Sequence, residues 1–401
     1  MNREQSPRGL RTHIAVVGRC NVGKSSLVNA LAGQSVAIVS DVAGTTTDAV
    51  SKSMELRSLG AVVLTDTAGF DDLSPLGKQR VAESRRVAEK CDMAIVVCNE
   101  NGDYAVEQEW VAEFDSKGVP VVVALTKSDQ IADAEGAVKG VEHALGRSVV
   151  TVSATSGEGI EALLEALQRA LPNEGRELTI TGNLVEAGDV VVLVMPQDKS
   201  APKGRLILPQ VQTIRELLDK RCIPVCCQPE ELECTLAELS RSPKLVITDS
   251  QAFARVAPLV PEGVALTSFS VLMACYKGDV EAFVEGAKTI DGLTENSRVL
   301  IAEACSHAPT NEDIGRVKLP AMLRRKVGAG LRVDVVGGND FPDDLSPYDL
   351  VIHCGACMFT RRTVLSRLER SKAQSIPMTN YGIAIAHLTG IIGRVVMPSE
   401  E

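Results

Sequence analysis

Aromatic residues are scarce in this chain of 401 residues, because Phe, Trp and Tyr together make up only 3% of it. Proteins that bind single-stranded nucleic acids stack bases on aromatic side chains, so this scarcity speaks against such a function. Basic residues are also fewer than acidic ones. The chain has 42 Lys and Arg and 52 Asp and Glu, which gives a formal net charge of −10. Nucleic-acid backbones recruit clustered positive charge. We therefore expect no nucleic-acid partner.

Long hydrophobic runs and an apolar leader are lacking as well. No stretch approaches the roughly eighteen apolar residues of a membrane-spanning helix, and residues 1–18 have no separate apolar segment ahead of the first predicted strand. The eleven cysteines are odd in number and unevenly spaced, which does not fit a secreted disulfide framework. We expect a cytoplasmic protein without a membrane partner, whose cysteines are core thiols, metal ligands or redox groups.

The chain is too long for one hydrophobic core, since domains mostly contain roughly 100–200 residues. In its first part, short apolar runs alternate with helix-like stretches, which predicts a doubly wound α/β domain with a parallel sheet. The predicted strands there are 13–17, 61–64, 93–97, 119–125 and 148–152. Breaker residues at 172–175 predict a linker.

Two further segments have strands of their own. The middle segment, about 188–288, has apolar positions at 214–218 and 230–239 that suit an interface as readily as a core. The last segment, from about 292, repeats strand and turn and predicts a smaller α/β sheet. The predicted strands of these segments are 189–194, 245–248, 264–267, 298–302, 331–336 and 350–352.

Residues 18–25 read Gly-Arg-Cys-Asn-Val-Gly-Lys-Ser, which fits G-x-x-x-x-G-K-S between a predicted strand and a predicted helix. Backbone N–H groups of such a loop close around the β-phosphate of a nucleotide, Lys24 bridges the β- and γ-phosphates, and Ser25 ligates magnesium. The predicted nucleotide-binding residues of this loop are Gly18, Asn21, Val22, Gly23, Lys24, Ser25 and Ser26.

Three more motifs follow strand ends of the same domain. Asp66 is expected in the outer shell of the magnesium ion, and the N–H of Gly69 at the γ-phosphate. Residues 126–129 resemble the guanine-reading motif of GTPases, in which Asp129 accepts two donors that guanine has and adenine lacks. The nucleotide is therefore expected to be GTP. Predicted base-loop residues are Thr126, Lys127, Asp129, Ser153 and Ala154; Thr126 stands where Asn is usual, which we expect to loosen the tie to the phosphate loop.

Asn21, together with residues 44–48, resembles the Era and TrmE branch of GTPases. That resemblance implies that Asn21 helps to hold a potassium ion against the phosphates and that Thr46 is the switch threonine on magnesium. With Lys24 and Gly69, Thr46 completes the predicted catalytic set. Phe70 stands where Ras-like enzymes have the Gln that orients water, so unaided hydrolysis is expected to be slow.

Cys354 and Cys357 follow the predicted strand 350–352, and Cys305 follows 298–302. Carboxyl ends of parallel strands meet at one sheet edge, so three thiols can converge there. Such a trio suits an iron–sulfur cluster or a zinc site completed by His, while a redox or merely buried Cys-x-x-Cys pair stays open. Candidates for a fourth ligand are His307, Glu312 and His353; the remaining cysteines are interpreted as core thiols.

An Era-like GTPase joined to Cys-Ser-His at 305–307 and His-Cys-Gly-Ala-Cys at 353–357 resembles the HydF family, the maturation GTPases of FeFe hydrogenases. Residues 196–212, 313–318 and 379–382 look like that family too, so the likeness covers essentially the whole chain. The resemblance implies a P-loop GTPase domain at 1–172, a dimerisation domain at 180–265 and a C-terminal α/β iron–sulfur cluster-binding domain at 266–401. It also implies a homodimer and a 4Fe-4S cluster on Cys305, Cys354 and Cys357.

The resemblance further implies a scaffold or carrier that receives a diiron precursor from two radical-SAM maturases and passes it to the apo-hydrogenase. Ala308 stands where many members have a second His, which makes Glu312 the preferred fourth ligand over His307. The expected cofactors are GTP, Mg²⁺, K⁺ and the 4Fe-4S cluster. Two alternatives remain: an Era-like RNA or ribosome assembly GTPase, and a redox-regulated GTPase whose Cys-x-x-Cys pair forms a disulfide.

Overall fold

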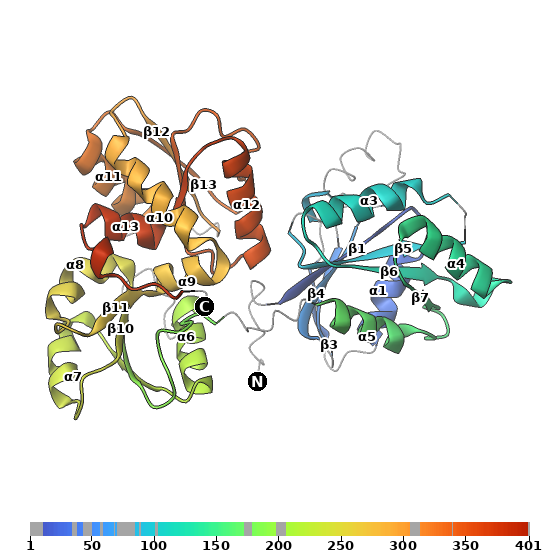
Figure 1. Ribbon diagram of the computed structural model, residues 1–401, viewed down its shortest axis with the longest axis horizontal. Helices are drawn as coiled ribbons and strands as arrows, with labels where there is room; N and C mark the ends of the chain where they lie inside the picture. The colour runs from blue at the N-terminus through green and yellow to red at the C-terminus, as the bar shows by residue number, and fades with distance from the viewer. Residues whose placement is uncertain are drawn as a thin grey trace. The chain divides into compact units, whose positions relative to one another are not determined.

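The structure, a computed structural model, divides into two compact units, residues 1–176 and 177–401, each of which contains strands and helices (Figure 1). It describes residues 11–33, 38–42, 50–56, 59–67, 69, 85–87, 90–100, 103–171, 179–197, 206–304, 313–338 and 340–399.

The described part of the first unit is built on a seven-stranded sheet in the order β2-β3-β4-β1-β5-β6-β7. Its strands are β1 (Thr12–Gly18), β2 (Ile38–Val42), β3 (Val50–Leu56), β4 (Gly60–Asp66), β5 (Met93–Cys98), β6 (Val121–Thr126) and β7 (Val149–Val152). From β4 to β7 all neighbours are parallel, whereas β3 is antiparallel to both β2 and β4. The carboxyl ends of the parallel strands therefore share one edge.

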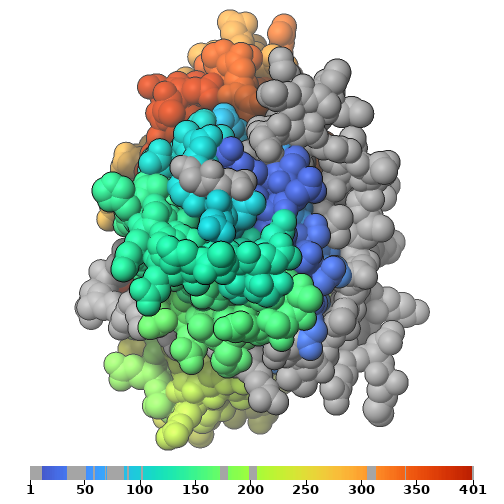
Figure 2. All heavy atoms as spheres, turned by 90° about the vertical axis from the view of Figure 1, so that its right-hand side faces the viewer, coloured from blue at the N-terminus to red at the C-terminus, as the bar shows by residue number. Residues whose placement is uncertain are grey.

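Helices cover both faces of this sheet (Figure 1). They are α1 (Lys24–Gly33), α3 (Ala105–Ser116), α4 (Ala134–Leu145) and α5 (Ile160–Ala170). Side chains of β1 alternate between two cores: Ile14 and Val16 pack with α1 and α5, and Ala15 and Val17 pack with α3 and α4. Figure 2 shows the surface of this unit, on which α3, α4 and α5 lie next to one another in teal to green.

The five strands expected in the first unit are present, with ends shifted by a few residues, but β2 and β3 were not predicted. The sequence of β3, Val-Ser-Lys-Ser-Met-Glu-Leu, has too few apolar residues for a clear alternation. Its pairing with β4 along the full length of both strands makes it a strand nonetheless. Tertiary pairing here overrides a weak local signal.

The second unit contains two four-stranded sheets within its described residues, in the orders β11-β10-β8-β9 and β13-β12-β14-β15, and both are entirely parallel. The strands are β8 (Val190–Val194), β9 (Ile223–Cys227), β10 (Leu245–Thr248), β11 (Ala265–Ser268), β12 (Arg298–Ala302), β13 (Arg332–Val336), β14 (Leu350–His353) and β15 (Met378–Asn380). The sequence did not predict β9, which contains Pro224, or the three-residue β15. Proline lacks a backbone donor and suits an edge, which is where β9 lies.

One apolar core passes through both sheets of the second unit. It includes Val192 and Val246 from the first sheet and Leu300 and Ile352 from the second. The helices around it are α7 (Leu232–Glu238), α8 (Phe253–Val256), α9 (Phe269–Lys277), α10 (Val280–Lys288), α11 (Leu319–Val327), α12 (Arg361–Ala373) and α13 (Tyr381–Leu388). Helix α6 (Leu208–Asp219) packs through Leu217 into a separate core on the first sheet. The expected border between the dimerisation domain and the cluster-binding domain, at residues 265 and 266, lies inside this compact unit. It stays a prediction.

The described helices are short, and the longest, α12, has 13 residues. None of the helices in the described ranges combines the length and the apolar character needed to cross a membrane.

Candidate functional site

The first candidate site is the phosphate loop, residues 18–25, between β1 and α1. A Cβ added to Gly18 would lie 2.3 Å from the carbonyl oxygen of Val97. Gly23, just before α1, has a φ of 104°, which side chains rarely permit. Glycine at both positions allows the tight strand-to-helix turn that phosphate-binding loops need.

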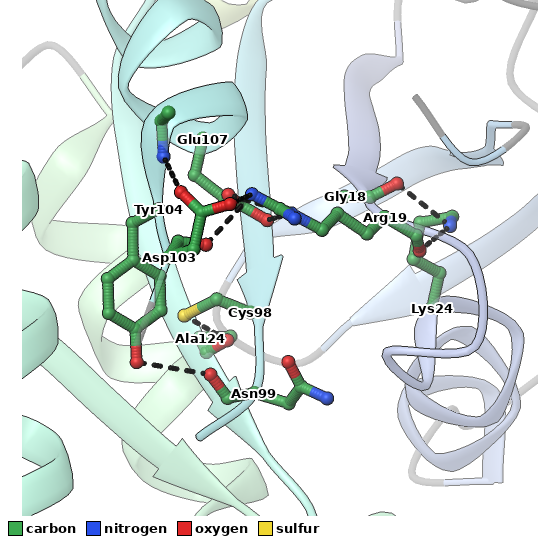
Figure 3. A network of polar contacts seen from close by, with 10 residues as sticks. Gly18, Arg19, Lys24, Cys98, Asn99, Asp103, Tyr104, Glu107 and Ala124 are labelled. Atoms are coloured by element: carbon green, nitrogen blue, oxygen red, sulfur yellow. Dashed lines mark hydrogen bonds and ion pairs between the residues drawn. The ribbon is translucent and has the colours of Figure 1, made fainter. Parts of the chain in front are cut away.

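Lys24 folds over the phosphate loop (Figure 3). Its Nζ donates to the carbonyl oxygen of Gly18 at 3.0 Å and to that of Arg19 at 2.7 Å. The residue is only 7% exposed. The ammonium therefore lies at the turn, where backbone N–H groups and a positive charge can act on the same anion. The role of Lys24 at the phosphates stays a prediction.

Ser25 and Asp66 meet where β4 ends and α1 begins. The hydroxyl of Ser25 donates to Oδ2 of Asp66 at 2.5 Å. The other carboxylate oxygen, Oδ1, is buried and has no hydrogen-bond partner in the described part of the chain. Burial raises the pKa of Asp66, against the lowering effect of Ser25 and of the Lys24 charge. A hydroxyl beside an unpaired carboxylate oxygen fits the oxygen-ligated magnesium ion that the motif predicts.

Gly69 lies directly against the phosphate loop. A Cβ added to it would come within 2.3 Å of the Cys20 Sγ and 2.5 Å of the Cys20 backbone nitrogen. No side chain fits at this position. The backbone of Gly69 is therefore held next to the loop, as the predicted contact of its N–H with a γ-phosphate requires.

The base loop is tied to the phosphate loop by two side chains. The Thr126 hydroxyl donates to the carbonyl oxygen of Val22, and Nζ of Lys127 donates to that of Asn21 at 2.9 Å. Thr126 therefore ties the end of β6 to the phosphate loop, and the expectation that this tie is looser than one made by Asn stays a prediction. Asp129 is exposed after Lys127, so its carboxylate is accessible to a ligand.

Ser153 and Ala154 follow β7 at the same sheet edge. Ser153 is fully buried, its Oγ accepts the N–H of Ser156 at 3.2 Å, and its carbonyl oxygen accepts the N–H of Gly157 at 2.9 Å. These hydrogen bonds fix a tight turn that positions Ala154 just beyond the strand. Their predicted contact with the guanine carbonyl stays a prediction.

The remaining loop residues differ in their surroundings. Asn21 is exposed and has a φ of 59°, a left-handed conformation that Asn tolerates better than most residues. Val22 is buried in the core beneath α1 and α5, and Ser26 is exposed in the first turn of α1. The potassium contact of Asn21 stays a prediction.

Arg19, which the motif leaves unspecified, links the phosphate loop to α3 (Figure 3). Its Nε lies 3.0 and 3.2 Å from the two carboxylate oxygens of Glu107, and Nη2 donates to the carbonyl oxygen of Asp103 at 2.8 Å. Glu107 is only 2% exposed. Burial by itself lowers the pKa of Arg19. The hydrogen bonds and charges of Glu107 and Asp103 together outweigh burial, so the pKa of Arg19 lies above its ordinary value. The sequence analysis did not predict this ion pair. A signal was present, because Glu107 lies at helical spacing on the same side of α3 as the apolar Trp110 and Phe114.

Several residues named in the sequence analysis lie outside the described residues. They are the switch threonine, the phenylalanine in place of the water-orienting Gln, one cluster cysteine and two candidates for the fourth cluster ligand. These are Thr46, Phe70, Cys305, His307 and Glu312.

The second candidate site lies at the carboxyl ends of β12 and β14. These strands are hydrogen-bonded neighbours, with Ala302 opposite His353. The N–H of Cys354 donates to the carbonyl oxygen of Ala302 at 2.9 Å. The segment that leads to Cys305 and the cysteine loop, residues 354–359, therefore leave the sheet side by side.

The sulfur of Cys354 accepts two backbone N–H groups, from Ala304 at 3.0 Å and from Ala356 at 3.4 Å. Such donors stabilise negative charge on sulfur, as in clusters held by thiolates. Cys357, like Cys354, is partly exposed, and burial raises the pKa of its thiol. This donor set fits an iron–sulfur cluster. Among the described residues no group of three or more His, Cys, Asp or Glu could hold a metal ion.

His353 is unsuited to be the fourth ligand. It is 1% exposed, its Nδ1 lies 2.8 Å from the carbonyl oxygen of Cys354, and its Nε2 lies 2.9 Å from Nη1 of Arg367. A carbonyl oxygen only accepts and a guanidinium only donates, so Nδ1 carries the proton and Nε2 is occupied. Burial, with the charge of Arg367, lowers the pKa of His353 to about 3. Both nitrogens are used, which removes this candidate.

The interpretation of the other cysteines as core thiols is wrong for three of them. Cys20, Cys226 and Cys234 are exposed. Cys20 lies in the phosphate loop and Cys226 on the edge strand β9. Four others are buried, namely Cys91, Cys98, Cys222 and Cys227.

Three family models match successive parts of the chain. Residues 13–127 match the 50S ribosome-binding GTPase, residues 180–278 the Hydrogen maturase F dimerization domain, and residues 281–398 the Hydrogen maturase F tetramerization domain. The first unit is therefore a GTPase domain, and the names of the other two models indicate self-association.

The curated relatives include GTPases that match less than half of this chain. The tRNA modification GTPase MnmE of Bacillus velezensis is 36% identical over 184 residues, 45% of this chain and 37% of the relative. GTPase Der of Wolinella succinogenes is 34% identical over 187 residues, 44% of this chain and 38% of the relative. The chain thus spans less than two fifths of the length of these relatives.

Solved structures give likenesses at lower identity. The G domain of the T. maritima FeoB iron transporter is 23% identical, covers 40% of this chain and 98% of its own, and has a TM-score of 0.32. Era of Aquifex aeolicus bound to GDP and AlF4⁻ is 19% identical, covers 62% of this chain and 97% of its own, and has a TM-score of 0.34.

Proposed function

The chain belongs to the HydF family of hydrogenase maturases, with a GTPase domain ahead of the two maturase F domains, and from this premise we propose that it is a GTP-hydrolysing iron–sulfur scaffold. It holds a 4Fe-4S cluster and passes a diiron precursor to apo FeFe hydrogenase. Two radical-SAM maturases supply the precursor. The observation that supports the cluster most directly is that β12 and β14, the strands before Cys305 and Cys354, are hydrogen-bonded neighbours.

In the GTPase domain, bound magnesium supplies positive charge at the β- and γ-phosphates. Ser25 and Thr46 are its ligands, and Asp66 stands in its outer shell. Lys24 and the backbone N–H of Gly69 stabilise charge on the phosphates as water attacks the γ-phosphorus and GDP leaves. Asn21 holds a potassium ion that adds to this charge. Hydrolysis is slow, because Phe70 cannot orient the attacking water.

Base recognition uses the far end of the same sheet edge. Asp129 accepts the N1–H and the 2-amino group of guanine, and the backbone of Ser153 and Ala154 contacts the guanine carbonyl. The ties of Thr126 and Lys127 to the phosphate loop support this proposal, because they hold the base loop and the phosphate loop at a fixed spacing.

GTP turnover by the full chain tests the first half of the proposal. Lys24→Ala should lower the affinity for GTP at least about 100-fold, since a charge-assisted contact to phosphate is lost. Replacing K⁺ by Na⁺ should slow hydrolysis in the wild type but not in Asn21→Ala. ATP hydrolysed as fast as GTP would contradict the assignment of Asp129.

At the other end, Cys305, Cys354 and Cys357 would hold three irons of the cluster, and Glu312 would be the ligand of the fourth. A carboxylate is the most exchangeable of these ligands, which would let the cluster accept an incoming precursor. Anaerobic reconstitution followed by EPR of the reduced protein tests this half. The wild type should give the signal of a reduced 4Fe-4S cluster, and the variant with all three cysteines replaced by Ala should give none. Equal loading of both proteins would exclude these ligands.

Self-association is proposed to take the form of a homodimer through α6 and β9. Val211 and Leu218, seven residues apart on one side of α6, are 47% and 55% exposed, and Ile223 on β9 is 49% exposed. Helix α6 contacts β9, which is the edge strand of this sheet among the described strands. An exposed strand edge with apolar neighbours is a surface that a second chain can cover.

The competing function, an RNA or ribosome assembly GTPase, is favoured by the match of residues 13–127 and by relatives named for tRNA modification. That likeness concerns the nucleotide site, which many GTPases share. RNA binding by the purified full chain that weakens steeply with salt would favour this function instead.

A further inference from the structure

Lys277, the last residue of α9, is buried among groups that no sequence motif connects to it. It is 2% exposed. Its Nζ donates to the carbonyl oxygens of Ala356 at 3.0 Å and Phe359 at 2.7 Å, and that of Cys357 lies at 3.5 Å. All three acceptors belong to the cysteine loop.

These contacts use the full capacity of an ammonium group, which has three donors. Bonds from a charged donor are about twice as strong as neutral ones. The carbonyl oxygen of Cys354, at the start of the loop, accepts two hydrogen bonds. Nδ2 of Asn380 donates to it at 3.3 Å, and Nδ1 of His353 lies 2.8 Å away. The carbonyl groups of the cysteine loop are thereby fixed to the protein interior, while both cysteine side chains remain partly exposed.

Charge points to the same site. Burying an ammonium group is costly unless an anion accompanies it. In the described part of the chain Lys277 has no ion pair with a carboxylate, and its Nζ is surrounded by backbone carbonyl oxygens of the loop that carries Cys354 and Cys357. An anionic group on the two sulfurs would compensate the buried charge.

Lys277 also comes from the other half of the unit. It lies in the segment that matches the dimerization domain, whereas the cysteine loop lies in the segment that matches the tetramerization domain. Helix α9 contacts α12 and α13, which lie in the half with the second sheet. It also contacts α6 and β11, which lie in the half with the first sheet (Figure 1). One helix therefore connects the two halves at the cysteines.

We propose that Lys277 is a positioning residue that fixes the cysteine loop, and that its ammonium group would supply positive charge near an iron–sulfur cluster held by that loop. The part that concerns the cluster rests on the proposed function. The part that concerns the loop does not, because the contacts join Lys277 to backbone carbonyl oxygens of the loop.

The loop is tested on the full chain without its cluster. Lys277→Met, of similar length but without donors, should speed amide hydrogen exchange in peptides of residues 354–360 at least tenfold, with little change in α6 and β10. The control Lys288→Met removes a lysine whose side chain is 60% exposed. It should change amide exchange neither in residues 354–360 nor in α6 and β10. Unchanged exchange at 354–360, or faster exchange spread over the whole unit, would overturn the positioning role.

A measurement on the wild type needs no variant. Acetylation of the native protein should modify Lys277 at least tenfold more slowly than Lys288; equal rates would overturn the contacts themselves. If Lys277→Met does not fold, Lys277→Gln, which is polar but uncharged and too short to make the same contacts, takes its place with the same outcomes.

The charge is tested on reconstituted protein. Lys277→Met should shift the reduction potential of the cluster to lower values, because removing a nearby positive charge disfavours the added electron, and Lys277→Arg should restore it in part. An unchanged potential would overturn the electrostatic role. Should the wild type load no cluster, the proposed function fails, and exchange and acetylation still decide whether Lys277 holds the loop.

Discussion

Gly69 illustrates at the scale of a residue how closely the nucleotide site is packed. The backbone of Cys20 occupies the space that a side chain at Gly69 would need. A substitution there has to push the phosphate loop away, since backbone cannot rotate aside as a flexible side chain can.

Gly69→Ala should therefore weaken GTP binding at least about tenfold, which corresponds to about 1.4 kcal/mol. Titration with a fluorescent GTP analogue measures it. The matched control is Gly140→Ala in α4, where nothing lies within 4 Å of the added carbon. A variant at Gly69 that binds GTP as tightly as the wild type would show that the loop has room.

The cysteines offer a second prediction at this scale. Burial raises the pKa of Cys98 and of Cys275 to about 12, so both thiols stay protonated at pH 8. Thiolates are the reactive form, so we expect iodoacetamide to leave these two unlabelled in the native protein while it labels the exposed Cys20 and Cys226. Mass spectrometry of the labelled peptides gives the answer, and rapid labelling of Cys98 would contradict the burial.

At the scale of an element, the ion pair of Arg19 joins the phosphate loop to α3. Glu107 is buried, so removing its partner leaves an uncompensated carboxylate. The pair therefore stabilises the position of the loop against the helix, and its energy should be measurable in the unfolding of the first unit.

Arg19→Met should lower the free energy of unfolding by about 2 kcal/mol. Trp110, the only tryptophan of the chain, lies in α3 and reports the unfolding of this unit by fluorescence in urea. The double variant with Glu107→Gln should lose less than the sum of the single changes, which is the sign of a direct interaction. Lys139→Met, from an exposed pair with Glu135, is the control and should cost less than about 0.5 kcal/mol. Full additivity would contradict the pair.

Elements with strong apolar patterns were predictable and those without were not. Strand β5, buried at every position, was found from the sequence nearly to the residue. Strands β3 and β9 were missed because polar residues in one and Pro224 in the other obscure the pattern, and their pairing partners decide their conformation.

At the scale of the whole molecule, the exposed side chains of Leu218 on α6 and Ile223 on β9 predict how copies associate. Leu218→Lys combined with Ile223→Lys should shift the full chain to a smaller species in analytical ultracentrifugation, because like charges would face each other across the interface. Val317→Lys, at a residue 43% exposed in the other half of the unit, is the control. An unchanged sedimentation coefficient in the double variant would place the interface elsewhere.

Both candidate sites were predictable in outline because their residues follow strand ends, and parallel strands bring such ends together. The neighbours of those residues were not. Glu107 for Arg19, Arg367 for His353 and Lys277 for the cysteine loop come from segments whose proximity depends on packing between helices and sheets, which no local pattern encodes.

The combination of a GTPase domain and an iron–sulfur site in one chain is tested most directly by the iron and acid-labile sulfide content of the full chain purified without oxygen. We expect about four iron and about four sulfide atoms per chain, lost when Cys305, Cys354 and Cys357 are replaced by Ala. Protein that binds zinc or no metal, and no sulfide, would contradict it.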